Sequence, residues 1–134
     1  VNHYHRYSYF ETVKKSQDVV IPGVYHTVRP IALEAGPVFV QNARQYTVID
    51  TEKFGSCVQM EVGAMLVGRI VNEQASSGEV TRGKEKGHFE YGGSTIIVLV
   101  PPNRAVIAEA LLEASAKGEE TPVVLGQQKG TTIS

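Results

Sequence analysis

The sequence has 134 residues and a mass of 14.6 kDa, which fits one globular domain. Its 42% apolar and 20% charged residues are typical of a folded chain, which excludes intrinsic disorder. With 13 basic against 14 acidic side chains, the net charge of -1 argues against nonspecific nucleic-acid binding. Cys57 is the only cysteine, so neither an intrachain disulfide nor a cysteine-based metal site can form.

Short strands separated by turns are expected through the first half of the chain. The β-prone stretches are residues 19–21, 24–33, 38–40 and 44–49, punctuated by Pro22-Gly23 and Gly36-Pro37. Pro30 predicts a bend or a sheet edge inside the second stretch. Residues 57–62 alternate apolar with polar or small side chains, which predicts a strand with one face in water.

The second half continues this pattern and adds one helix. Residues 63–71 are more uniformly apolar and predict a buried strand, whereas the polar residues 72–87 predict a loop around one short strand. Lys84-Glu85-Lys86 is interpreted as a solvated charged run within that loop. Further strands are expected at 88–91, 94–100 and 121–125, and a helix at 107–116 that Lys117-Gly118 closes.

These elements predict one mostly β domain over residues 1–134, an antiparallel barrel-like sandwich with one short C-terminal helix. No apolar run approaches the roughly 20 residues that a membrane-spanning helix needs.

The segment with chemical potential is Gly92-Gly93-Ser94-Thr95, which interrupts two predicted strands. Two residues without β-carbons let the backbone adopt conformations in which the Ser94 hydroxyl can attack the Gly93 carbonyl. Elimination from the resulting ester would cut the chain between Gly93 and Ser94 and leave dehydroalanine, which hydrolyses to an amino-terminal pyruvoyl group. Taken alone, the tetrapeptide is more often only a turn.

The order of motifs along nearly the whole chain resembles the phosphatidylserine decarboxylase family, a pyruvoyl-dependent group. The segments that carry the resemblance are residues 3–7, 22–30, 39–44, 54–55, 62–68, 83–89 and 92–95. Each segment is common by itself, but their shared order is specific.

The resemblance implies self-cleavage into a β-fragment, residues 1–93, and an α-fragment, residues 94–134. Ser94 would become the pyruvoyl cofactor, whose ketone forms a Schiff base with the substrate amine and accepts electrons as carbon dioxide leaves. His5 is the candidate for proton transfer, because Tyr4-His5-Arg6 matches the family's Tyr-His-Arg segment.

Two departures from the family pattern concern self-cleavage. The family has a second His three positions after His5, where this chain has Ser8, and an upstream Asp of the family has no counterpart. We therefore expect a catalytic domain that lacks its N-terminal region, a substitute base such as His3, His26 or His88, or impaired processing. Ser8, His3, Gly92 and Thr95 are the candidates for supporting the cleavage.

His3 and His5 could also be metal ligands, because alternate strand positions share a face. No third and fourth ligand accompany them, so the sequence predicts no metal site.

By resemblance, the expected reaction converts phosphatidylserine to phosphatidylethanolamine and carbon dioxide. One alternative is a related decarboxylase of a soluble, for instance aromatic, amino acid; another is a homologue that does not process and serves as a scaffold. The resemblance also implies a homodimer and peripheral attachment to the cytoplasmic face of a membrane, and the charge balance predicts no nucleic-acid partner.

Overall fold

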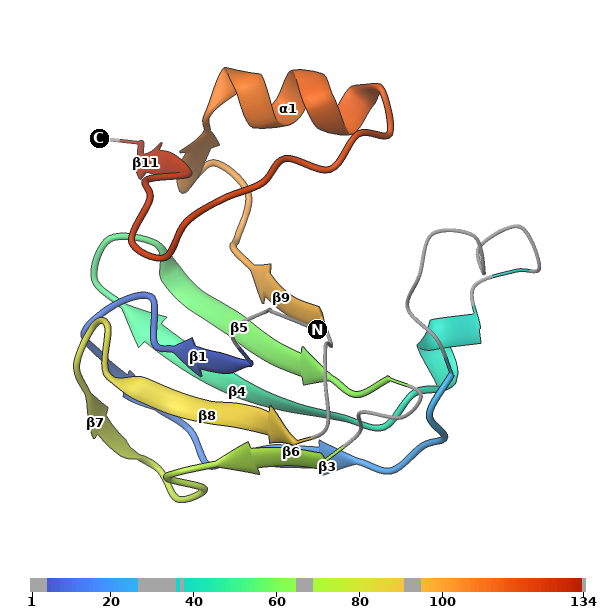
Figure 1. The fold of residues 1–134 in the computed structure, drawn as a ribbon. Helices are drawn as coiled ribbons and strands as arrows, with labels where there is room; N and C mark the ends of the chain where they lie inside the picture. Colours follow the sequence, from blue (N-terminus) through green and yellow to red (C-terminus); the bar gives the residue numbers. More distant parts are fainter. Residues whose placement is uncertain (1–4, 27–35, 37, 65–68, 91–94, 134) are drawn as a thin grey trace.

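A computed structural model of the chain describes residues 5–26, 36, 38–64, 69–90 and 95–133. Within these residues two antiparallel sheets lie face to face, and a smaller C-terminal arm extends beyond them (Figure 1). The predicted class, a mostly β antiparallel sandwich with one short C-terminal helix, is confirmed. The sheets of the described residues do not close into a barrel.

The larger sheet is built around a long hairpin. Its strands run in the order β7-β2-β4-β5-β9, with β3 also paired to β4. Their bounds are β2 (Val13–Lys15), β3 (Val19–Ile21), β4 (Arg44–Thr51), β5 (Gly55–Val62), β7 (Gly78–Val80) and β9 (Thr95–Leu99). The strands predicted at 19–21, 44–49 and 57–62 are confirmed, and the one at 94–100 is confirmed over Thr95–Leu99.

The smaller sheet has the order β1-β8-β6, with β1 (Arg6–Ser8), β8 (Glu85–Glu90) and β6 (Arg69–Asn72). A β-bulge interrupts its register: Tyr7 pairs with Gly87, but Ser8 pairs with Glu85, so Lys86 is an extra residue on β8. The short strand predicted within 72–87 is β7, yet Glu85–Gly87 belongs to β8 and not to a loop.

The alternation in β5 is real, but its polarity is opposite to the prediction. The polar face was expected in water, whereas Cys57, Gln59 and Glu61 are 0%, 2% and 0% exposed, inside the sandwich. Val58 and Met60 are the half-buried residues. The inversion arises because the facing sheet supplies polar and charged partners for the half of the interior near Glu61.

The apolar half of the interior is small. Tyr9, Val13, Ile49 and Val80 form a buried cluster, against which Phe10 packs. In the smaller sheet, the rings of Tyr7 on β1 and Phe89 on β8 lie 5.0 Å apart. Apolar packing therefore fills one part of the interior, and polar contacts fill another.

The C-terminal arm consists of β10 (Ala105–Ile107), α1 (Glu109–Ala116) and β11 (Gly130–Thr132). The predicted helix is confirmed, and it ends as expected at Lys117, with Gly118 in the left-handed region at a φ of 73°. The strand predicted at 121–125 is wrong: Pro122 lacks a donor, and Gly130–Thr132 takes the place beside β10.

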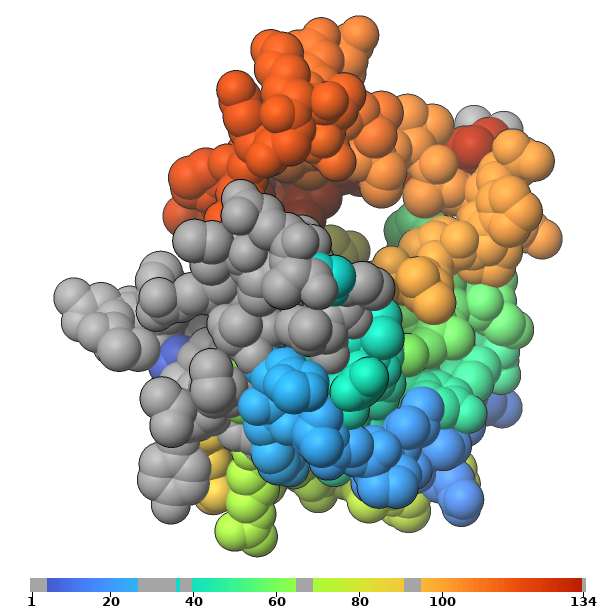
Figure 2. Space-filling model, turned by 90° about the vertical axis from the view of Figure 1, so that its right-hand side faces the viewer, coloured from blue at the N-terminus to red at the C-terminus, as the bar shows by residue number. Residues whose placement is uncertain are grey.

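The arm stands away from the sheets. None of the residues of α1 is buried. Figure 2 shows the helix and its neighbours above the sandwich, with an opening between them and the green strands. The arm therefore contributes little to the interior that the two sheets share.

Three further expectations are corrected. Residues 38–40 begin a 3₁₀ helix, η2 (Val38–Gln41), because Arg44 Nη2 donates to the Val40 carbonyl at 2.6 Å and holds the turn before β4. In the stretch 24–33, Val24 forms only an isolated bridge with Asn42, and residues 27–33 lie outside the described residues. Of the buried strand predicted at 63–71, residues 65–68 lie outside the described residues, and 69–71 belong to β6, an edge strand whose Arg69 is exposed.

No helix among the described residues is long and apolar enough to cross a bilayer.

Candidate functional site

Five strand ends meet at one end of the sandwich, which we call the Thr95 end. There β4 begins at Arg44, β5 ends at Val62, β6 begins at Arg69, β8 ends at Glu90 and β9 begins at Thr95. Arg44 pairs with Val62, Val62 with Thr95, and Arg69 with Glu90. These are the last residue pairs of both sheets at this end.

The segment predicted to be cleaved joins the two sheets at this end. It follows Glu90 in the smaller sheet and precedes Thr95 in the larger one. Gly92, Gly93 and Ser94 themselves lie outside the described residues, as does His3. Of the predicted cleavage motif, the structure describes Thr95, half-buried and held by its pairing with Val62.

His5 lies at the Thr95 end. Its carbonyl accepts a hydrogen bond from Phe89 N at 2.9 Å, beside the last residues of β8. The residue is half-buried. The structure therefore brings His5 next to the strand that leads into the predicted cleavage segment.

Ser8 lies at the opposite end of β1. It pairs with Glu85 at the bulge, and its carbonyl accepts from Gln59 Nε2 at 3.3 Å. Three residues of extended chain span roughly 10 Å, so Ser8 and His5 are not neighbours along this strand. His26 and His88 are both half-buried; Asn42 holds the backbone of His26, and His88 pairs with Arg6.

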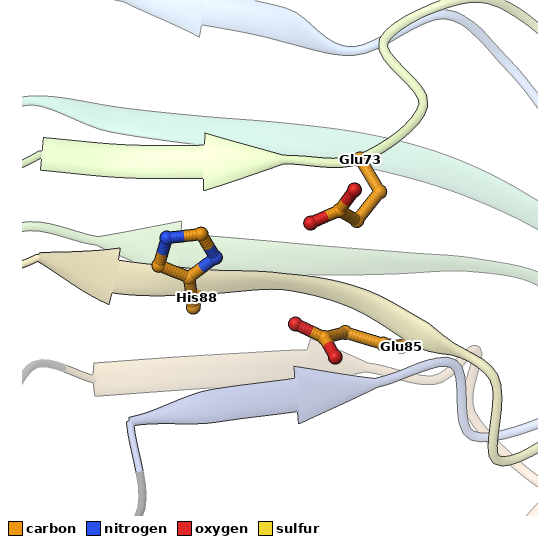
Figure 3. Close-up of side chains that lie close together, drawn as sticks. All are labelled: Glu73, Glu85 and His88. Carbon is orange, nitrogen blue, oxygen red and sulfur yellow. The ribbon is translucent and has the colours of Figure 1, made fainter.

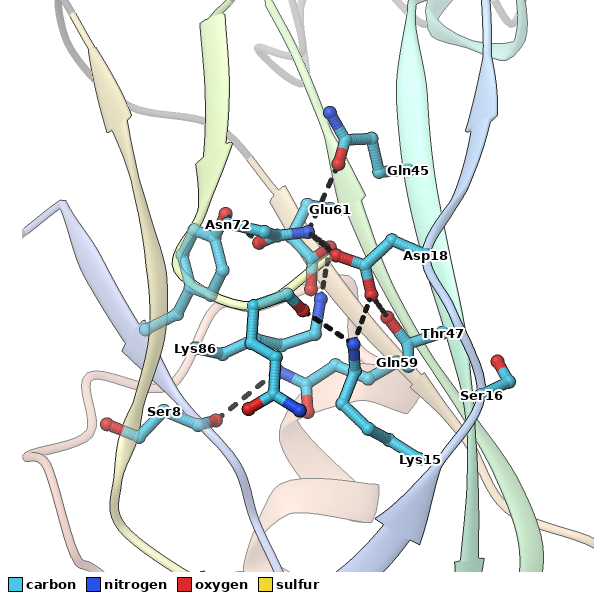
Figure 4. A network of polar contacts seen from close by, with 12 residues as sticks. Ser8, Lys15, Ser16, Asp18, Gln45, Thr47, Gln59, Glu61, Asn72 and Lys86 are labelled. Carbon is cyan, nitrogen blue, oxygen red and sulfur yellow. Dashed lines mark hydrogen bonds and ion pairs between the residues drawn. The ribbon is translucent and has the colours of Figure 1, made fainter. Parts of the chain in front are cut away.

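A buried polar cluster lies between the two sheets (Figure 4). Lys86 Nζ donates to Glu61 Oε2 at 2.7 Å, and neither side chain has any exposed surface. Lys15 Nζ lies 3.0 Å from Asp18 Oδ1, with side chains 0% and 3% exposed. Two ammonium groups and two carboxylates thus balance one another in the interior.

Asn72 connects the two ion pairs. Its Nδ2 donates to Asp18 Oδ2 at 2.8 Å and to Gln45 Oε1 at 3.1 Å, and it lies 3.5 Å from Glu61 Oε2. The Tyr7 hydroxyl donates to Asn72 Oδ1 at 2.8 Å. Asn72 therefore links both sheets through one amide group.

The β-bulge explains how Lys86 enters this cluster. Because an extra residue disrupts the alternation of β8, Lys86 and the following Gly87 both face inward. At Gly87 a β-carbon would lie 2.2 Å from the Val71 carbonyl and 2.8 Å from the Tyr7 hydroxyl, so only glycine fits. The interpretation of Lys86 as a solvated loop residue is therefore wrong.

Burial raises the pKa of three acidic side chains in and beside the cluster. It raises the pKa of Glu61, an effect that the nearby Lys86 ammonium opposes. Burial also raises the pKa of the Tyr7 hydroxyl, and it raises that of Tyr9 to about 12. Glu61 Oε1, Gln59 Oε1 and the Tyr9 hydroxyl are buried without a hydrogen-bond partner among the described residues.

A groove of about 300 Å³ opens beside the Thr95 end; we call it the Arg69 groove. Arg44, Arg69 and Gln45 supply its polar lining, and Ile21 and Tyr25 supply exposed apolar surface. Arg69 Nη1 lies 3.5 Å from Glu90 Oε2, with 75% of the Arg69 side chain exposed. This guanidinium is available to an anion that enters the groove.

A second cavity of about 550 Å³ lies at the other end of β4, beside Asp50 and Glu52. Acidic and basic side chains are mixed in its lining, which includes Glu11, Lys14 and Lys53. It is separated from Arg44 by the length of β4, and it contains none of the predicted site residues.

Sequence reasoning missed Glu61, Lys86, Asn72, Asp18 and the two groove arginines. One signal was present: Gln59 and Glu61 share the strand face of Cys57, a residue type that is usually buried. The bulge at Lys86 left no equivalent pattern in the sequence.

Comparison with known proteins gives one consistent family. A family model described as phosphatidylserine decarboxylase matches residues 1–130. The phosphatidylserine decarboxylase proenzyme of Clostridium tetani is 38% identical over 128 residues, which are 95% of this chain and 43% of the relative. Phosphatidylserine decarboxylase proenzyme 2 of Clostridium acetobutylicum is 40% identical over 132 residues, 98% of this chain and 45% of the relative.

The proenzyme of Clostridium novyi is 35% identical over 131 residues, 97% of this chain and 44% of the relative. The chain therefore spans less than half the length of these curated relatives. No solved structure matches the chain.

Proposed function

This chain belongs to the phosphatidylserine decarboxylase family, and we propose that the whole protein converts phosphatidylserine to phosphatidylethanolamine and carbon dioxide. The observation that carries the proposal is the position of His5 at the end of β8, the strand that leads into Gly92-Gly93-Ser94-Thr95. The relatives are named proenzymes, which supports activation by self-cleavage, here between Gly93 and Ser94.

Ser94 is the source of the pyruvoyl group in this proposal, and the residues around it fit such a group. Thr95, the next residue, is anchored to Val62 in the larger sheet, so a group at position 94 would begin a firmly held strand. Arg69 and Arg44 give this end of the molecule positive charge for an anionic substrate. When present, the pyruvoyl carbonyl supplies the electron sink for decarboxylation.

His5 serves as the proton-transfer residue. An imidazole gains and loses a proton near neutral pH, so it can hold the proton that must reach the substrate carbon after carbon dioxide leaves. The hydrogen bond from Phe89 N to the His5 carbonyl fixes the backbone from which this side chain extends. Because it is half-buried, part of the residue stays accessible.

The Arg69 groove supports a phospholipid over a soluble amino acid. A phosphodiester is an anion that a guanidinium binds through paired hydrogen bonds, and the groove carries the largely exposed guanidinium of Arg69 and the positive charge of Arg44. Val20, Ile21 and Tyr25 at its rim are 63%, 40% and 48% exposed, which suits contact with the apolar part of a lipid. This arrangement favours peripheral attachment to a membrane surface; homodimer formation stays a prediction from the family.

The test uses the complete protein and its Ser94→Ala variant. We expect mass spectrometry to find two polypeptides divided between Gly93 and Ser94, with the later one modified by an aminooxy reagent, and Ser94→Ala to stay whole. Vesicles that contain phosphatidylserine should lose carbon dioxide only with the divided protein. Turnover of lipid by protein that stays undivided would refute the proposal, and turnover restricted to soluble amino acids would refute the lipid assignment.

If the complete protein neither divides nor decarboxylates, the scaffold alternative gains support. Ser8→His then tests whether the missing processing base is the cause. Recovery of division would restore the enzyme proposal, whereas an undivided Ser8→His protein would favour the scaffold.

A further inference from the structure

Three side chains converge on the outer face of the smaller sheet, away from the buried polar cluster (Figure 3). They are Glu73, Glu85 and His88, and one potential ligand atom from each lies within 4.8 Å of the other two. His88 and Glu85 are half-buried and Glu73 is exposed, so the group is open to ions from solvent.

The β-bulge creates this convergence. In a regular strand Glu85 and His88, three positions apart, would face opposite sides of the sheet. Because Lys86 is the extra residue, Glu85 and His88 both face outward. Glu73 follows β6, and its amide donates to the Lys86 carbonyl at 2.9 Å, which fixes its backbone beside the bulge.

An unsatisfied nitrogen is the second observation. His88 Nδ1 is buried and has no hydrogen-bond partner among the described residues. Figure 3 shows this nitrogen directed toward the two carboxylates. A buried ring nitrogen without a partner loses its hydration without compensation, so a bound cation would satisfy it.

We propose that Glu73, Glu85 and His88 bind a divalent transition-metal ion, with Zn²⁺ as the best match. One imidazole nitrogen with two carboxylate oxygens suits Zn²⁺ better than Mg²⁺ or Ca²⁺, which prefer oxygen ligands alone. In a tetrahedral site with bonds of about 2.1 Å, the ligand atoms lie roughly 3.4 Å apart. The present limit of 4.8 Å therefore requires the side chains to close in on the ion, and the exposed Glu73 is the one with most room to move.

Arg6 modulates the site. Its guanidinium donates to Glu85 Oε1, so it neutralises one of the two carboxylates and leaves a net negative charge for the cation. The same contact competes with the metal for Glu85. Replacing Arg6 should therefore strengthen metal binding.

No metal site was predicted from the sequence, in which His3 and His5 were the candidate ligands. Glu73, Glu85 and His88 are spread over 16 positions of the sequence, and without the bulge two of them would not share a face. The site is independent of the proposed decarboxylation, since neither His5 nor Ser94 is among its ligands.

The test is calorimetric titration of the metal-stripped protein with Zn²⁺. We expect one ion per chain, with at least tenfold weaker binding in His88→Gln and in Glu73→Gln, and severalfold tighter binding in Arg6→Gln. His26→Gln and Glu79→Gln are matched controls that remove a histidine and an exposed strand glutamate elsewhere, and they should bind like the wild type. Co²⁺ substitution should give visible absorption that His88→Gln abolishes.

Unchanged Zn²⁺ affinity in both His88→Gln and Glu73→Gln would overturn the proposal, as would the absence of binding by the wild type over the whole titration. Because Glu73 is exposed, its variant should fold normally, and circular dichroism verifies this.

Discussion

Lys86 and Glu61 form an ion pair of 2.7 Å in the interior of the sandwich, with neither side chain exposed. Lys86 comes from the smaller sheet and Glu61 from the larger one, so the pair joins the two layers. Buried pairs recover their desolvation penalty only through close geometry and further hydrogen bonds. Here Asn72, 3.5 Å from Glu61 Oε2, is the additional partner.

Lys86→Met should destabilise the protein strongly. The change keeps the length of the side chain but leaves Glu61 as a buried carboxylate without its cation, which costs about 3–5 kcal/mol. Urea unfolding followed by circular dichroism measures the loss. Lys84→Met, two residues earlier on an exposed side chain, is the matched control and should change the free energy of unfolding by less than about 0.5 kcal/mol.

The double variant Glu61→Gln/Lys86→Met should recover part of that loss. Removing both charges removes the unpaired carboxylate, so the double variant is expected to be more stable than Lys86→Met alone. Equal stability of Lys86→Met and the double variant would show that the unpaired Glu61 carboxylate carries no penalty.

Glu61 should give the protein a pH-dependent loss of stability. Since burial raises its pKa in the folded state above the ordinary value of 4.5, the folded protein binds more protons than the unfolded chain as pH rises past that value. Stability should therefore fall through this window and level off above the raised pKa. The comparison is between the wild type and Glu61→Gln/Lys86→Met, in unfolding experiments from about pH 4 to 7.

A wild-type stability that increases relative to the double variant over the same range would contradict a raised pKa at Glu61.

His5→Gln should separate the two steps of the proposed function. If His5 transfers a proton during decarboxylation, its loss should lower kcat by about 10²–10⁴-fold while division at Gly93 and Ser94 continues. Mass spectrometry measures division and carbon dioxide release measures turnover. Glu79→Gln, which changes an exposed residue of β7 with no assigned role in the reaction, is the control; normal turnover in His5→Gln would exclude the assigned role.

Arg69→Gln tests the groove as the binding site for the phosphodiester. Loss of one charge-assisted hydrogen bond should raise KM for phosphatidylserine in vesicles roughly tenfold. Because the Arg69 to Glu90 pair is largely exposed, the variant should keep its folding stability. Arg82→Gln, an exposed arginine between β7 and β8, should leave KM unchanged; an equal effect from both would indicate general electrostatic attraction to the vesicle.

The sequence predicted local structure where local pattern decides it. The β4 and β5 strands and the α1 helix follow from alternation, β-branched residues and the Gly118 stop. What it could not predict is which side of β5 faces inward, because that depends on partners contributed by Lys86 and Asn72, far along the chain. Alternation alone favours the apolar face, and here the opposite sheet overrides it.

Sequence motifs likewise identified only some residues of the candidate site. His5 and Thr95 were identified from the motifs, and both lie at the Thr95 end. Arg69 was assigned to a buried strand because of its apolar neighbours, although it is the first residue of an edge strand. Grooves and clusters of this kind arise from strand ends that meet in space, which periodicity does not encode.

The pairing of β9 with β5 bears on what would happen after the proposed scission. Thr95–Leu99 contributes a complete row of main-chain bonds to a strand on the earlier polypeptide. Two separate chains would then still share one continuous sheet, held together without any covalent connection. The pieces should travel together through gel filtration and part only in denaturant, so a single elution peak says nothing about whether the backbone is intact.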